Sequence, residues 1–77
     1  MPQAPDVSRV QREIGRRVRA ARLRAGLTQE MAAANAGIDY KRWQRIELGE
    51  TNCTIRSLVR VAEAVETTFW TLLGARG

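Results

Sequence analysis

The chain has 77 residues and carries 13 basic against 8 acidic side chains, a net charge of +5. This length permits one small domain, whose core stabilises it only modestly unless disulfides, a metal or a partner subunit contributes. A single cysteine, Cys53, excludes an internal disulfide, and the absence of histidine leaves no ligand set for a structural metal. We therefore expect self-association, with no bound metal and no cofactor.

The net charge indicates the kind of partner, and the length of the apolar runs indicates the location of the protein. All but one of the basic residues are arginine, and such an excess suits a polyanion, because each neutralised phosphate releases condensed counterions. A solvated face that keeps the protein soluble is the alternative. No apolar run is long enough for a membrane span, and the opening MPQAPDV lacks the layout of a signal peptide. We expect a cytoplasmic protein with no membrane partner and a reduced, inert Cys53.

The first predicted element is a long helix. Ser8 and Gln11 have the spacing of a capping box, and apolar residues recur behind them at helical intervals. This pattern predicts a helix over residues 9–25 and a flexible tail over residues 1–8. The helical domain is therefore expected to occupy residues 9–77.

Four shorter helices are predicted after it. Each begins after a side chain that can cap it, and glycines end the second and third. The predicted caps are Thr28, Asp39, Thr54 and Thr68. No strand pattern competes, so we predict an all-α bundle of five helices. The few residues between the second and third helices fit a helix-turn-helix.

The third predicted helix, within GIDYKRWQRIELGE, has two unlike sides. At about 100° per residue, Trp43 and Ile46 fall together on one side. Long polar side chains share the opposite arc: Tyr40, Lys41, Gln44 and Arg45. One side is expected to be buried and the other to point outward.

Three segments resemble a known family: IGRRVRAARLRAGLTQE, AGIDYKRWQRIELG and EAVETTFWTLL. They are similar to the Cro and phage-repressor class of helix-turn-helix proteins, the XRE-like family. The most specific features are GLTQE, the I-E-x-G at residues 46–49 and the spacing between them. The resemblance covers residues 14–74 and implies a five-helix fold of the lambda-repressor type. Residues 52–58, NCTIRSL, are similar to the controller proteins of restriction–modification systems.

The resemblance implies that the third helix enters the major groove of double-stranded DNA, where base edges are distinguishable. The implied base-reading residues are Tyr40, Lys41, Gln44 and Arg45, although some of them could contact only phosphate or water. The implied phosphate contacts are Thr28, Gln29, Arg42, Thr51 and Asn52. Of these, Thr28 is better explained as a cap, and a turn-forming role explains Thr51 and Asn52 equally well.

Two further features concern the core. The family pairs an arginine and a glutamate at the positions of Arg22 and Glu47, which implies a partly buried ion pair with a structural role. Trp43 stands where the family usually has a smaller aliphatic residue, and the second helix is unusually rich in alanine. We predict that the indole compensates for the small side chains by covering Ala32 or Ala36. The alternative is that Trp43 stacks on DNA.

The last helix has more apolar side chains than so short an element can bury. The predicted dimer contacts are Val65, Phe69, Trp70 and Leu73, whereas Leu72 is assigned to the core. The implied function is a homodimeric transcriptional regulator that binds a near-palindromic operator and controls its own gene. Glu30 is a hint of contact with RNA polymerase. An antitoxin that neutralises a partner toxin is the rival, and no catalytic constellation supports an enzyme.

Overall fold

The computed structural model describes residues 6–74. Within this range the chain contains five α-helices and no strand: α1 Val7–Arg24, α2 Gln29–Ala36, α3 Tyr40–Leu48, α4 Ile55–Ala64 and α5 Phe69–Leu72. The predicted all-α class and the order of the helices are confirmed. Over the same range, no helix combines the length and the low polarity needed to cross a bilayer.

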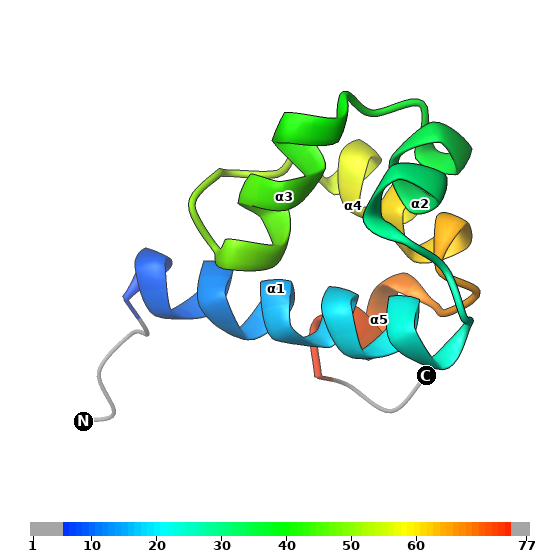
Figure 1. Cartoon of the computed structure of the whole chain (residues 1–77). Helices are drawn as coiled ribbons and strands as arrows, with labels where there is room; N and C mark the ends of the chain where they lie inside the picture. The colour runs from blue at the N-terminus through cyan, green and yellow to red at the C-terminus, as the bar shows by residue number, and fades with distance from the viewer. Residues whose placement is uncertain (1–5, 75–77) are drawn as a thin grey trace.

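The helices form a framework on which α2 and α3 are held (Figure 1). α1 extends along one side of the molecule, and α3 lies against its amino-terminal half. α2 contacts both α3 and α4, and the short α5 connects α4 back to α1. The two helices of the predicted helix-turn-helix are therefore each supported by a neighbour outside the motif.

The helix caps agree with the sequence prediction except at the start of α1. Thr28 Oγ1, for example, accepts a hydrogen bond from the Met31 N–H at 3.1 Å. At α1, however, Asp6 rather than Ser8 is the cap, and its carboxylate accepts from the Ser8 N–H at 2.9 Å. A carboxylate caps as well as a hydroxyl does and also favours the positive end of the helix dipole.

This cap changes two of the predicted boundaries. The helical domain begins with the cap at Asp6 rather than at residue 9, so residues 6–8 do not belong to the predicted tail. Gln11 does not complete a capping box; its side-chain amide donates to Asn52 Oδ1 at 3.0 Å. The rest of the predicted tail, residues 1–5, lies outside the described residues, as does the end of the predicted domain at residues 75–77.

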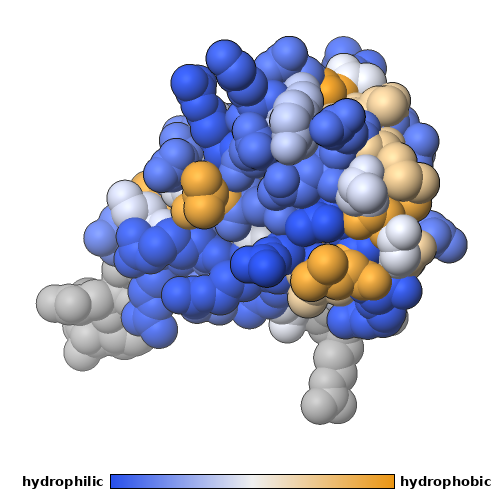
Figure 2. Space-filling model, viewed as in Figure 1, coloured by the Kyte–Doolittle hydropathy of each residue, from blue (hydrophilic) through white to orange (hydrophobic). Residues whose placement is uncertain are grey.

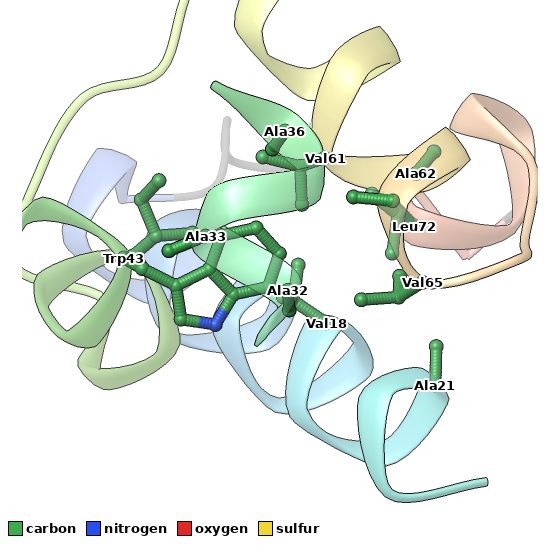
Figure 3. Packing of buried hydrophobic residues seen from close by; sticks show 12 residues of the cluster. Val18, Ala21, Ala32, Ala33, Ala36, Trp43, Val61, Ala62, Val65 and Leu72 are labelled. Carbon is green, nitrogen blue, oxygen red and sulfur yellow. The ribbon is translucent and has the colours of Figure 1, made fainter. Parts of the chain in front are cut away.

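A single apolar core lies between the helices. It includes Val18, Ala21, Ala32, Ala33, Ala36, Trp43, Ile46, Val61, Ala62, Ala64, Val65 and Leu72. Trp43 is completely buried, at 0% exposure, and its indole extends across α2 at Ala32 and Ala33 (Figure 3). The predicted compensation between one large side chain and several small ones is confirmed, and stacking of Trp43 on DNA is excluded by its burial.

One carboxylate joins the first three helices. Glu47 on α3 and Arg22 on α1 form the ion pair implied by the resemblance, with side chains 4% and 10% exposed. Arg22 donates from Nε and Nη2 to the two carboxylate oxygens. The Trp43 indole N–H adds a bond of 2.6 Å, and Gln29 Nε2 of α2 adds one of 3.1 Å. Arg22 also donates to the Leu27 carbonyl at 2.9 Å, so the buried charges are well satisfied.

A glycine allows α1 and α3 to approach this closely. A Cβ atom at Gly15 would lie 2.5 Å from the Glu47 carbonyl oxygen and 2.6 Å from that of Ile46. These separations are below van der Waals contact, so any side chain at Gly15 would force the two backbones apart. The distance between the helices, and with it the geometry of the Arg22–Glu47 pair, depends on this position.

We expect Gly15→Ala to destabilise the fold, even though alanine is the better helix former by about 1 kcal/mol. The new methyl group has no room, and overpacking of this kind costs about 1–3 kcal/mol. Equilibrium urea denaturation measures the change. Ala20→Gly, at an exposed position of α1, is the control and should cost only the propensity term of about 1 kcal/mol. A Gly15→Ala variant more stable than the wild type would contradict the close approach.

Glu47→Gln should lower the free energy of unfolding by about 3–5 kcal/mol, because it leaves the buried Arg22 charge without a counter-charge. The matched control is Glu13→Gln, which removes an exposed ion pair with Arg16 and should cost less than about 1 kcal/mol. Both changes are measured by urea denaturation followed by circular dichroism. Similar losses for the two variants would show that Glu47 has no special role.

Candidate nucleic-acid interface

The two sides of α3 are divided as the sequence predicts. Trp43 and Ile46 are buried, whereas Tyr40, Lys41 and Arg45 are exposed and Gln44 is partly exposed. The surface over α1 and α3 is mostly hydrophilic, and apolar atoms gather mainly along the edge of this view where α2 lies (Figure 2). α3 therefore presents a polar, partly cationic side to solvent while its opposite side is fixed in the core.

The beginning of α3 is well ordered by local hydrogen bonds. Asp39 caps the helix and accepts from the Lys41 and Arg42 N–H groups at 3.1 and 3.4 Å. One turn later, Gln44 Nε2 donates to the Tyr40 hydroxyl at 3.3 Å. The Tyr40 proton and the second Gln44 N–H both remain as donors. These two side chains thus hold each other in place and can still bind a further group.

Gln29 lies between Glu47 and solvent at the start of α2. Because a carboxylate only accepts hydrogen bonds, the contact with Glu47 fixes which end of the Gln29 amide carries nitrogen. One N–H of that nitrogen is used by Glu47, and the other is left for an outside acceptor. The adjacent backbone N–H groups at the helix amino terminus also favour an anion. The Thr28 hydroxyl oxygen is engaged in capping, and its proton is free to donate.

The loop between α3 and α4 contributes most of the remaining predicted phosphate contacts. Asn52 accepts from Gln11 of α1 through its amide oxygen, so its NH₂ group is left as the donor. Thr51 is partly buried beside it. The last predicted phosphate contact, Arg42, is exposed on α3 and not part of the loop. The contact with Gln11 ties this loop to α1, and Cys53 packs against the core.

Cys53 in this loop is not a reactive thiol. Burial raises the pKa of the Cys53 thiol above its ordinary value, and the nearby Arg42 charge offsets this only in part. The thiol lies at a cavity of about 220 Å³ whose apolar lining includes Val10, Ile14 and Leu58. A raised pKa keeps the thiol protonated, and the thiol form is a poor nucleophile. This environment agrees with the predicted role of a small apolar side chain.

Sequence reasoning missed Arg19 of α1 as a neighbour of this surface. Arg19 lines a shallow groove together with Gln29, Gln44 and the exposed Leu48. The signal was present in the spacing of Arg12, Arg16 and Arg19, which places three arginines on one side of a helix. α1 is therefore part of the surface that carries the candidate contacts, as well as part of the scaffold.

A second, apolar surface lies at the carboxy-terminal helix. Trp70 and Leu73 are 56% and 42% exposed, and Trp70 packs edge-on against Phe69 with ring centroids 5.2 Å apart. Val65 does not belong to this surface. It is only 1% exposed and lies in the core, because it continues the buried side of α4. Leu72 is buried, as expected.

Comparisons with known proteins agree with this geometry. A family model described as a helix-turn-helix domain matches residues 13–68. The fold is similar to the restriction–modification controller protein C.AhdI from Aeromonas hydrophila, with 27% identity, a TM-score of 0.77, and coverage of 80% of this chain and 94% of that one. It is also similar to the controller protein C.Esp1396I, with 27% identity, a TM-score of 0.75, and coverage of 83% and 86%.

A further structure shares the fold alone. An HTH_3 family transcriptional regulator from Vibrio cholerae has 23% identity and a TM-score of 0.82, with coverage of 90% of this chain and 39% of that one. Among curated proteins, none matches the sequence at a significant level. The family model covers most of the chain, and the five helices have the arrangement of XRE-type proteins. The chain therefore belongs to the helix-turn-helix family of DNA-binding regulators.

Proposed function

We propose that the protein is a sequence-specific regulator that binds a near-palindromic operator as a homodimer and controls its own gene, as part of a restriction–modification operon. The observation that carries the proposal is the outward side of α3. Its side chains are displayed by a helix whose Glu47 accepts hydrogen bonds from Arg22, Gln29 and Trp43. The similarity to two controller proteins supports the assignment to such an operon.

Base reading is assigned to Tyr40, Lys41, Gln44 and Arg45. A guanidinium or ammonium group can donate to guanine, and an amide can pair with adenine. Arg42, exposed on α3, is assigned to phosphate. Gln29 at the start of α2 and the loop residues Thr51 and Asn52 are assigned to phosphate as well, because each retains an N–H or O–H group that can donate. Glu30 is exposed in the first turn of α2 and remains the candidate for a contact with RNA polymerase.

The dimer is assigned to Trp70, Leu73 and part of Phe69. Two exposed large apolar side chains on so short a helix form a surface that a second copy could cover. In a twofold dimer the two α3 helices would enter successive major grooves about 34 Å apart on one face of the duplex. The operator is accordingly expected to be a near-palindrome.

Arg45→Ala should reduce the discrimination between the DNA upstream of the gene and a random duplex, by about 1–3 kcal/mol if the arginine makes a bidentate base contact. Arg42→Ala should instead weaken binding to both duplexes by a similar factor. Fluorescence anisotropy titrations at two salt concentrations measure both effects. Arg56→Ala on α4 is the control for a general loss of charge. Equal losses on the two duplexes for Arg45→Ala would refute its assignment to base reading.

Leu73→Asp should convert the dimer to a monomer at micromolar concentration, because a charge would be buried in the apolar contact. Sedimentation equilibrium measures the mass. Leu23→Asp introduces the same charge at an exposed leucine of α1 and should leave the mass unchanged. A wild-type protein that sediments as a monomer would show that there is no dimer. A Leu73→Asp variant that remains dimeric would show that the dimer contact lies elsewhere.

A further inference from the structure

The solvent side of α1 carries a row of arginines that the proposed contacts do not use. Arg12, Arg16 and Arg19 lie within a narrow arc of the helix, all exposed, and extend along it for about 10 Å. We call these three residues the α1 arginine track. The helix contains seven arginines and a single acidic residue, Glu13.

The ends of the track lie beside the two groups of candidate phosphate contacts. Arg19 shares its shallow groove with Gln29 and Gln44. At the other end, a Cβ atom built at Gly49 would lie 2.6 Å from the Arg12 Cα, so α1 is packed against the start of the loop that carries Asn52. The track therefore lies along α1 between the amino terminus of α2 and the α3–α4 loop.

Little negative charge within the protein neutralises the track. Glu13 pairs with Arg16 and Arg17, while no acidic residue in the range 6–74 forms an ion pair with Arg12 or Arg19. The carboxyl end of α3 does approach α1 at Gly15. Its helix dipole, however, amounts to only about half a negative charge, which is less than the charge on the track. An external polyanion is the natural counter-charge.

We propose that the α1 arginine track binds the phosphate backbone of duplex DNA and joins the contact at Gln29 to that at Asn52 in one continuous basic path. This inference rests on the proposed function, from which it takes duplex DNA as the ligand and the phosphate contacts at Gln29 and Asn52. The track reads no bases. It supplies the sequence-independent part of the affinity, which makes binding salt-dependent and holds the protein on non-operator DNA between encounters with its site.

The test compares two double variants with equal loss of charge. Arg12→Gln/Arg19→Gln removes the unpaired ends of the track, and Arg56→Gln/Arg60→Gln removes two exposed arginines of α4. Binding to a fluorescein-labelled random duplex of about 30 base pairs, long enough for two half-sites, is followed by anisotropy between about 50 and 200 mM salt. The random duplex isolates backbone contacts from base reading.

The track variant should lower the slope of log affinity against log salt concentration by about 2, since each phosphate contact contributes about 0.9. At about 0.15 M salt its affinity should fall by tenfold or more. The α4 variant should keep the wild-type slope. Arg12→Lys/Arg19→Lys retains both charges and should restore most of the slope, which a purely structural effect of the glutamines would not do.

Thermal unfolding of each variant shows whether its fold is intact. If Arg12→Gln disturbs the packing against Gly49, Arg19→Gln alone should still lower the slope by about 1. If the track and α4 variants have the same slope of log affinity against log salt concentration, the proposal that the α1 arginine track binds phosphate is wrong. A wild-type chain that binds the random duplex but does not prefer any upstream DNA would overturn the proposed operator function alone. No binding to either duplex would overturn both.

Discussion

The arrangement of the first three helices depends on the Glu47 carboxylate. It accepts hydrogen bonds from Arg22 on α1, Gln29 on α2 and Trp43 on α3 itself. A buried carboxylate is costly unless its oxygens are fully bonded, and this requirement can be met only when the three helices have their native positions. The direction of α3, and therefore the display of its polar side, is set by the same contact that joins it to α1 and α2.

The packing of the core next to this carboxylate explains how helices as short as α2 are stabilised in a small chain. α2 has only eight residues, four of them alanine, and it is too short to be stable by itself. The Trp43 ring supplies the buried area that larger aliphatic side chains would supply elsewhere, and its N–H also satisfies Glu47. One residue thus fills the space beside α2 and bonds the ion pair, which ties the packing of α2 to the electrostatics of α1 and α3.

Much of this architecture could be predicted from the sequence because the relevant signals are local. Capping side chains and helical spacing gave the five helices, and the division of α3 into a buried and an exposed side followed from Trp43 and Ile46. The pairing of Arg22 with Glu47 came from the family resemblance. That Gln29 and Trp43 donate to the same carboxylate was not predicted, because the Trp43 contact within α3 depends on side-chain rotamers and the Gln29 contact depends also on the distance between α2 and α3.

The errors have different origins. Asp6 and Ser8 are both good caps, and local preference does not decide between them. Val65 follows Leu58 and Ala62 on the buried side of α4, so its spacing indicated the core, and assigning it to the dimer surface disregarded that pattern. Arg19 could have been found from the arginine spacing on α1, but its position beside Gln29 and Gln44 requires the tertiary fold.

The two tryptophans occupy opposite environments, and this gives the chain two independent optical reporters. Trp43 is shielded from water and bonded to a carboxylate, so its emission follows the integrity of the folded core. Trp70 is largely hydrated on α5, and its emission responds to whatever covers that helix. Replacing the exposed Trp70 by phenylalanine would leave a protein whose tryptophan emission reports on the core alone, whereas replacing Trp43 would also remove a donor to Glu47.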